Sequence, residues 1–466
     1  MTSIYWVFLT FYFFLGVIAE DSTSKKSLDS LVFVSCVDGQ KKDELDNYVS
    51  QEYWKTIKSD NPDALFWMGD SVYTKCGSPV CVSKGYLVQS NNEFYRDLLK
   101  TGLFVDGTWD DHDYGVNDGG KEVLFKDVSQ QLFLDFISVP VDSPRRNRKG
   151  VYSSHTFGPP GKQIKVIILD TRYHRDRNYV HEKYGISSFA YLDTPLTSIF
   201  AASLRFFASV FGYGHAYEGD MLGEDQWKWL EKELSNSKAL ANIIISSVQV
   251  TTLYPVVESW GHFPNSRKRL LSLIGKTKPR GLLFLSGDVH WGQIFESNDS
   301  QKSLVEITSS GMTHSVSNRI LDSFVISVTL PIFTGWSLSN KSPNYYTKEN
   351  YGKLDFEYIC PEAQQGKENL VECSGIIVKA SIKDLNGNIK LFKKFKFDNE
   401  SNENHLEALS KIPQMITEKS IKQIFGRICI IFVTIIWGIQ IVIVFAYLIL
   451  RIITSFTRFS KKKKED

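Results

Sequence analysis

Residues 31–38 read Leu31-Val32-Phe33-Val34-Ser35-Cys36-Val37-Asp38, a short apolar run that ends abruptly in polar residues. Apolar runs of this length without alternation are typical of strands that are buried on both faces. Further runs of this kind also end in polar residues: 64–68 before Gly69-Asp70, 164–169 before Asp170, 242–245 before Ser246, and 281–285 before Ser286-Gly287-Asp288.

Helical patterns lie between these strands, at 42–58, 93–100, 224–236 and 264–274. Such alternation favours an α/β fold or a layered αββα arrangement. Two alternating segments near the end, 376–382 and 389–397, are joined by a turn that contains Asn-Gly and predict a closing pair of strands. We therefore expect one folded domain over 31–397, with its ligands at the carboxyl ends of the strands.

Three of the polar segments that follow predicted strands carry metal-ligand side chains. They read Gly69-Asp70-Ser71-Val72-Tyr73, Trp109-Asp110-Asp111-His112-Asp113 and Ser286-Gly287-Asp288-Val289-His290. An Asp after a strand is often only a helix cap, but several like charges that converge at one sheet edge repel unless a cation lies among them. The three segments together therefore predict a metal site.

A site with two metal ions has a specific chemistry. Two cations a few ångströms apart clamp a phosphoryl group, activate a bound water to hydroxide for in-line attack on phosphorus, and stabilise the leaving oxygen. Asp70 is placed to bridge the two ions. His112, beside a carboxylate that binds metal, is a natural general acid for the departing alkoxide.

The motifs Ser-Cys, Gly-Asp-x-x-Tyr, Trp-Asp-Asp-His-Asp and Gly-Asp-Val-His occur in this order, and the set resembles the PhoD-like (alkaline phosphatase D) family of the calcineurin-like metallophosphoesterases. Supporting segments lie at 169–176, 222–230 and 260–267, so the resemblance covers roughly residues 31–315. It implies a four-layer αββα sandwich, hydrolysis of phosphate mono- or diesters, and ferric iron (Fe3+) with calcium (Ca2+) as cofactors.

The same resemblance assigns roles to single residues. It implies that Cys36 and Tyr73 bind the iron, that Asp70 bridges, that Asp288 and His290 complete the shell, and that Asp111 or Asn117 faces the second ion. Cys36 is also the cysteine that is left over in the folded domain, once Cys429 is assigned to the predicted membrane span and the other four to disulfides. Its alternative role is that of a small buried hydrophobe.

Two further features concern the substrate and the second ion. Arg172 and Arg267 are candidates for phosphate contacts, and each could instead form an ordinary surface salt bridge. Many calcineurin-like enzymes have a metal-binding His after a central strand, where this chain reads Ser246-Ser247-Val248-Gln249. The more oxygen-rich shell favours calcium or, as alternatives, Mg2+ or Mn2+ over zinc.

Both ends of the chain predict membrane targeting. Residues 5–18 are almost entirely apolar and precede small residues, so 1–19 reads as a cleaved signal peptide, with an uncleaved anchor as the alternative. Residues 428–450 contain no charge and are long enough to span a bilayer, and lysines and arginines follow them in 451–466. We therefore expect a polar linker at 398–427, one C-terminal transmembrane helix, and a cytosolic tail: a type I protein of the secretory pathway.

The tail ends Lys463-Lys464-Glu465-Asp466, which resembles the dilysine retrieval signal of endoplasmic-reticulum proteins. The alternative is a stop-transfer cluster that binds anionic lipid. Cysteine spacing supports an oxidising compartment, since it predicts local disulfides Cys76–Cys81 and Cys360–Cys373. Three sequons, at Asn298, Asn340 and Asn399, are compatible with a lumenal glycoprotein.

The chain has 54 basic and 52 acidic residues, a balance that offers no electrostatic footprint for nucleic acid. Two apolar, aromatic-rich stretches, 189–214 and 320–338, are either core or interface helices or lie on the lumenal leaflet. The expected function is a membrane-anchored phosphoester hydrolase whose substrates include lipid or glycolipid phosphates. The alternatives are a non-catalytic lumenal binding protein on the same fold and a hydrolase of another ester.

Overall fold

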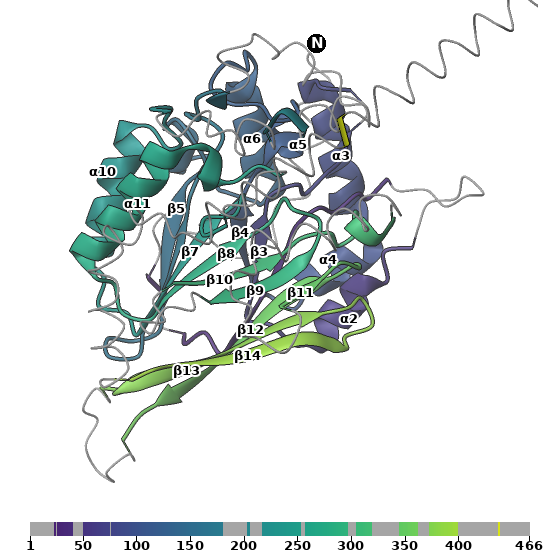
Figure 1. Cartoon of the computed structure of the whole chain (residues 1–466). Coiled ribbons are helices and arrows are strands. Elements are labelled where there is room, and N and C mark those ends of the chain that lie inside the picture. The colour runs from purple at the N-terminus through teal and green to yellow at the C-terminus, as the bar shows by residue number, and fades with distance from the viewer. Residues whose placement is uncertain are drawn as a thin grey trace, which may run out of the picture.

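Two β-sheets packed face to face form the centre of the molecule (Figure 1). The computed structural model describes residues 23–24, 26–40, 50–74, 76–179, 203–205, 217–252, 257–296, 304–318, 344–361, 372–398 and 437–438. The eight-stranded sheet has the order β1 (Thr23–Ser24), β5 (Ser153–Phe157), β6 (Ile164–Ile168), β7 (Ala241–Ser246), β8 (Leu282–Ser286), β10 (Val305–Ser309), β9 (Gly292–Glu296), β11 (Tyr345–Tyr346). The six-stranded sheet has the order β14 (Ile389–Phe397), β13 (Gly375–Lys383), β12 (Tyr351–Ile359), β2 (Ser30–Val34), β3 (Ala64–Met68), β4 (Phe104–Thr108).

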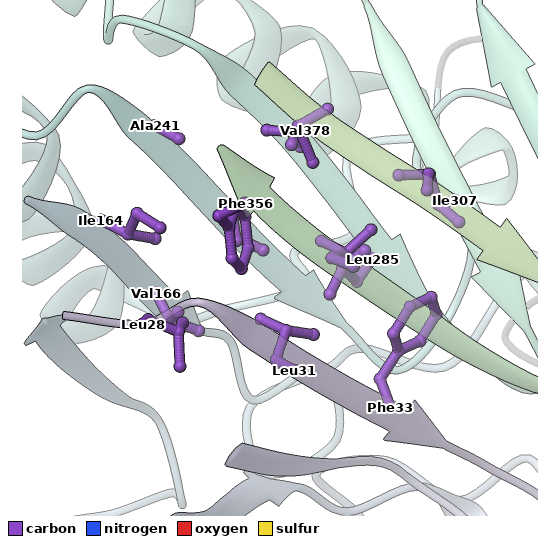
Figure 2. Close-up of a cluster of buried hydrophobic side chains, with 14 of the residues drawn as sticks. Leu28, Leu31, Phe33, Ile164, Val166, Ala241, Leu285, Ile307, Phe356 and Val378 are labelled. Carbon is purple, nitrogen blue, oxygen red and sulfur yellow. The ribbon is translucent and has the colours of Figure 1, made fainter. Parts of the chain in front are cut away.

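Strand β2 shows why the predicted apolar runs do not alternate. Leu31 and Phe33 point into the core between the two sheets, whereas Val32 and Val34 pack into a second core on the other face of the six-stranded sheet. Since successive side chains of a strand point to opposite faces, a strand with apolar partners on both faces needs apolar residues throughout. Figure 2 shows Leu31 and Phe33 from β2 beside Val166 from β6 and Leu285 from β8.

Helices cover the outer face of each sheet. Helices α10 (Glu224–Ser235) and α11 (Pro264–Thr277) pack Trp227, Leu230 and Leu270 onto Ile244 of the eight-stranded sheet. On the other side, α2 (Tyr53–Ser59), α4 (Glu93–Leu99) and α6 (Lys126–Phe136) bury large residues against the six-stranded sheet. The order helix, sheet, sheet, helix is the αββα layering that the sequence predicts.

The other described helices are short or lie beside these layers. They are α3 (Pro79–Asn91), α5 (Asp111–Tyr114) and the 3-10 turns η1 (Pro144–Arg146), η2 (Trp260–His262) and η3 (Val316–Asn318). Helix α3 packs against α6, and α5 follows β4 directly (Figure 1).

The parallel strands place their carboxyl ends at a shared edge. Strands β2, β3 and β4 run parallel to one another in one sheet, and β6, β7, β8 and β10 run parallel in the other. The loops that leave these strands carry the residues predicted to bind metal.

The predicted closing strands are β13 and β14, which pair antiparallel, and β12 joins them to β2. Both predicted disulfides are present, Cys76–Cys81 and Cys360–Cys373, and Cys36 is free and buried. Strand β12, which continues the six-stranded sheet antiparallel to β2, was not predicted from the sequence.

Within the part of the chain that the structure describes, no helix has the length and apolar character needed to cross a membrane. The predicted span 428–450 lies outside that part except for 437–438, and it stays a prediction. The predicted signal peptide 1–19, the tail 451–466, the linker after residue 398 and the three sequons also lie outside the described residues.

Candidate metal centre

Four strands end with a potential metal ligand at the same relative position. Cys36 comes two residues after β2, Asp70 two after β3, Asp110 two after β4 and Asp288 two after β8. The first three strands belong to the six-stranded sheet and the fourth to the eight-stranded sheet. The ligand positions therefore come from both sheets and meet where the sheets' edges adjoin.

The side chains of these loops converge closely. Four groups of three residues place one ligand atom each within 4.8 Å of the others: Cys36, Asp70 and His290; Asp70, Asp111 and His112; Asp70, Asp110 and Asp288; Asp111, Asp118 and Glu258. Asp70 belongs to three of the four groups, which is the position that a bridging carboxylate requires.

Cys36 and Tyr73, the two residues predicted to bind iron, lie in contact with Asp70. The Cys36 Sγ atom lies 3.6 Å from Asp70 Oδ2 and 3.0 Å from Ser310 Oγ. The Tyr73 hydroxyl donates to Asp70 Oδ2 at 2.8 Å and lies 3.1 Å from His290 Nε2. Burial raises the pKa of the Cys36 thiol to about 11, so a thiolate here needs a cation to stabilise it.

The carboxylates are crowded and hidden from water. Burial, and then the charge of Asp111, hold the pKa of Asp70 well above its usual range. Burial followed by the charges of Asp110 and Asp111 does the same to Asp288. Among the described residues, the buried atoms Asp110 Oδ2 and Asp111 Oδ1 have no hydrogen-bond partner. Orphaned carboxylate oxygens beside a thiol, a phenol and an imidazole fit bound metal ions.

The backbone of the centre is held in an unusual conformation. Five residues of the centre have a positive φ: 58° at Cys36, 52° at Asp70, 53° at Asp118, 68° at Asp288 and 64° at His290. Outside glycine this conformation is uncommon and costs free energy, and it gathers at functional sites where the surrounding structure enforces it. Gly69, just before Asp70, has a φ of 96°, and a Cβ there would lie 2.5 Å from Asp110 Cβ.

His112 is the second residue of helix α5, at the rim of the cluster. Its backbone N–H donates to Asp70 Oδ1 at 3.3 Å, and its ring lies 4.1 Å from the Tyr73 ring. The ring of His314 stacks on Tyr73 at the same centroid distance, 4.1 Å. The sequence analysis did not select His314. The role of His112 as general acid stays a prediction.

The predicted arginines have other partners. Arg172 is fully buried, and its Nε donates to Asp110 Oδ1 at 2.5 Å while NH1 lies 2.7 Å from Glu258 Oε2. Arg267 donates to the carbonyls of Val250 and Thr251 at 2.8 and 3.0 Å. Neither arginine forms a surface salt bridge, and the described contacts of Arg267 lie outside the metal cluster. Asn117 lies in the turn after α5, next to Asp118.

Several residues of the centre escaped the sequence analysis. Asp118 and Glu258 come from loops, and Arg175 and Arg205 bind them: Arg205 NH1 lies 2.7 Å from Asp118 Oδ2, and Arg175 pairs with Glu258. Asp110 lies in a motif that the sequence analysis selected, but its role as a ligand was not predicted. At the position where many calcineurin-like enzymes carry a histidine, the Ser247 hydroxyl donates to Asp110 Oδ1 at 2.6 Å.

Comparison with known proteins identifies the family. The model of the PhoD-like phosphatase family matches residues 106–357, more than half of the chain. This segment contains Asp111, His112, Asp288 and His290 and begins after Cys36 and Asp70. A search of curated proteins found no match.

Two solved structures are among those that match this chain. A structure of PhoD is 14% identical, with a TM-score of 0.47 over 85% of this chain and 79% of that one. A dimetal phosphatase from Danio rerio is 11% identical, with a TM-score of 0.38 over 80% of this chain and 99% of that one. The family assignment rests on the family model rather than on these structures. The chain belongs to the PhoD-like phosphatase family.

Proposed function

We propose that the protein is a metal-dependent phosphoester hydrolase of the alkaline phosphatase or phosphodiesterase type. The observation that carries this proposal is the position of Asp70, whose carboxylate belongs to three of the four groups of converging ligand atoms. Membership of the PhoD-like family supports metal-dependent hydrolysis of phosphoesters. Bound cations supply the Lewis acidity for such a reaction, since they lower the pKa of a water molecule and neutralise phosphoryl oxygens.

The donor set suggests which ions bind. Cys36, Tyr73 and His290 surround one side of Asp70, and a thiolate with a phenolate suits Fe3+. Asp110, Asp111 and Asp288 offer further carboxylate oxygens near Asp70, which suit Ca2+, with Mg2+ or Mn2+ as alternatives. Asn117, one residue before Asp118, is a further oxygen donor for this second position.

His112 is the proposed general acid. Its ring stands beside Tyr73 at the rim, and its backbone is tied to Asp70, so the imidazole is oriented by the same residues that form the centre. An imidazole at this place gives its proton to the alkoxide oxygen as the bond to phosphorus breaks.

The site of action is proposed to be the lumen of the secretory pathway. The two disulfides indicate an oxidising compartment. The signal peptide 1–19 and the span 428–450 would anchor the catalytic domain to the membrane, with Lys463-Lys464-Glu465-Asp466 for retrieval to the endoplasmic reticulum. A lumenal anchor places lipid and glycolipid phosphates within reach as substrates.

The test combines metal analysis with activity of the full chain in detergent. Iron and calcium are measured by elemental analysis in wild type and Cys36→Ser, beside hydrolysis of aryl phosphate mono- and diesters. We expect Cys36→Ser to lose iron, and His112→Ala to keep the metals while losing about 100-fold or more of kcat. His174→Ala, a histidine outside the four ligand groups, is the matched control.

Equal iron in wild type and Cys36→Ser would remove the cysteine ligand from the proposal. Full turnover by His112→Ala would remove the general acid. A protein that holds its metals and hydrolyses neither ester would be a binding protein on the same fold. Phospholipid in micelles that is cleaved no better than soluble aryl phosphate would count against a lipid substrate.

A further inference from the structure

Three arginines surround the carboxylate of Glu258 at the edge of the metal centre. Arg172 and Arg175 form ion pairs with Glu258, and the charge of Glu258 also acts on Arg205. The phosphoryl group of a phosphoester arrives with negative charge, so an arginine that reaches the substrate would add to the charge neutralisation that bound cations supply.

We propose that Arg205 forms an anion subsite at the edge of the metal centre, that it binds oxygens of the substrate's phosphoryl group, and that it favours phosphomonoesters over diesters. The proposal rests on the proposed function for its substrate. Arg205 lies in the segment that connects β6 to α10, and it belongs to the described residues 203–205 of that segment.

The position of Arg205 follows from its partners. Its NH1 atom donates to Asp118 Oδ2 at 2.7 Å, and the backbone N–H of Asp118 donates to Asp111 Oδ2 at 2.8 Å. The charge of Asp288, which belongs to the central ligand group, also acts on Arg205. The guanidinium therefore flanks the cluster and is connected to it through Asp118.

Exposure separates Arg205 from the other arginines. The side chains of Arg172 and Arg175 are 0% and 2% exposed, whereas that of Arg205 is 10% exposed. Arg172 lies beneath Asp110, and Arg175 donates to the carbonyls of Asp118 and Gly119. These two arginines hold the loops of the centre together, and Arg205, itself largely buried, is the least buried of the three beside the cluster.

The chemistry of the guanidinium fits a phosphoryl ligand. An arginine has five N–H donors in a planar fork, more than one carboxylate accepts, so a single arginine can contact Asp118 and an anion together. A phosphomonoester brings two negative charges and three non-bridging oxygens, whereas a diester brings one charge and two such oxygens. A fixed guanidinium therefore favours the monoester.

The backbone around Asp118 orients the carboxylate that binds Arg205. Its φ of 53° is a conformation that aspartate adopts at a cost, and the adjoining turn is tightly packed, since a Cβ on Gly120 would lie 2.5 Å from the Arg175 carbonyl oxygen. The turn fixes the direction of the Asp118 carboxylate, and the carboxylate fixes the guanidinium. Substrate thus meets an arginine that is already oriented.

The test compares Arg205→Lys and Arg205→Gln with wild type in the full-length, metal-loaded protein. Arg269→Gln is the matched control, since Arg269 pairs with Glu224 on the surface, with side chains 45% and 63% exposed. Measurements are KM and kcat for an aryl phosphate monoester and diester, the Kd of inorganic phosphate by calorimetry, metal content, and Tm.

We expect Arg205→Gln to raise the monoester KM and the phosphate Kd about 10- to 100-fold, and Arg205→Lys to raise both by less. The diester KM should rise several-fold less than the monoester KM. The metal content of both variants should equal that of wild type. Unchanged KM and Kd in both variants would overturn the proposal, as would an equal rise in Arg269→Gln or an equal loss for monoester and diester. If Arg205→Gln does not fold, the monoester KM and the phosphate Kd of Arg205→Lys test the proposal instead. If wild type hydrolyses neither ester, the proposed function fails, and the phosphate Kd still tests the subsite by itself.

Discussion

At the scale of single residues, the centre is a balance of buried charges. Glu258 lies among Arg172, Arg175 and Arg205, which more than offset the effect of burial and hold its pKa well below the usual range. His262 lies near the same charged groups, and burial together with positive charge disfavours its protonated form. Burial, and then the charge of Arg205, lower the pKa of His262 from 6.5 to about 4.

This shift predicts a pH dependence of stability. Between about pH 6.5 and pH 4 the unfolded chain protonates His262 whereas the folded chain keeps it neutral, so the folded state loses stability as pH falls through this window. The loss is at most about 3 kcal/mol at pH 4. His262→Gln removes the titrating group, so its free energy of unfolding, measured by denaturant titration at several pH values, should fall less steeply below pH 6.5. Parallel curves for wild type and variant would contradict this.

The sequence predicted those members of the site that directly follow strands, because an apolar run locates the strand and the next polar residues then lie at the sheet edge. Asp70 and Asp288 are examples. Asp118, Glu258 and Arg205 come from loops or connecting segments, and no local periodicity says where such segments fold back. The partners of an arginine are even harder to predict, because its long side chain can extend in many directions. Arg267, for example, donates to two backbone carbonyls.

At the scale of elements, a buried ionic network joins the edges of the two sheets. Asp106 on β4 accepts from Arg145 NH1 at 2.9 and 3.0 Å and from Ser153 Oγ at 3.0 Å, and it lies 2.5 Å from His155 Nε2. Ser153 and His155 belong to β5 in the other sheet. Burial alone would raise the pKa of Asp106, but the charges of Arg145 and His155 hold it well below its usual range.

Removing one partner of this network should destabilise the fold strongly. Asp106→Leu leaves the Arg145 guanidinium buried without its counter-charge, at a cost of about 3–5 kcal/mol in the free energy of unfolding. The double variant Asp106→Leu/Arg145→Met removes both charges and should lose less than Asp106→Leu alone. Urea denaturation of wild type, Asp106→Leu, Arg145→Met and the double variant measures this. A double variant that loses the sum of the two single losses would show that the pair acts independently.

The elements themselves were largely predictable where both faces are buried, as for β2, β3 and β8. A strand was expected before Trp109, but its bounds were not, because β4 reads Phe104-Val105-Asp106-Gly107-Thr108 and no long apolar run marks it. It is a strand because Asp106 finds its charge partners in the fold and Gly107 packs against Trp67, where a Cβ would lie 2.3 Å from the Trp67 carbonyl oxygen. Both causes are tertiary contacts, so local patterns could not reveal where this strand begins and ends.

At the scale of the whole molecule, the metal centre joins the two sheets, since its ligands follow strands from each. Contacts across this junction include the hydrogen bonds from the backbone N–H groups of Met312 and Thr313 to the carbonyls of Ser35 and Cys36. The layered fold could be predicted from the alternation of strands and helices. The pairing of β12 with β2 could not, because it joins residues about 320 positions apart.

Removal of the metals should therefore lower the Tm of the protein and reverse the sign of the Tm change that Asp70→Asn causes. With metals bound, Asp70→Asn should have a lower Tm than wild type, because it loses a shared ligand and the binding free energy that comes with it. After treatment with a chelator the order should reverse, because the variant has one carboxylate fewer among Asp110, Asp111 and Asp288. Thermal unfolding of both proteins with and without EDTA tests this. A wild-type Tm that EDTA leaves unchanged would contradict it.

The left-handed backbone at Cys36, Asp70, Asp118, Asp288 and His290 has an evolutionary consequence. Glycine at any of these positions would relieve about 1 kcal/mol of strain. A population selected only for heat resistance would drift toward glycine at these codons and lose its ligands one after another. If the proposed function holds, we therefore expect relatives selected for catalysis to retain side chains at these five positions, and relatives kept for the fold alone to carry glycines there.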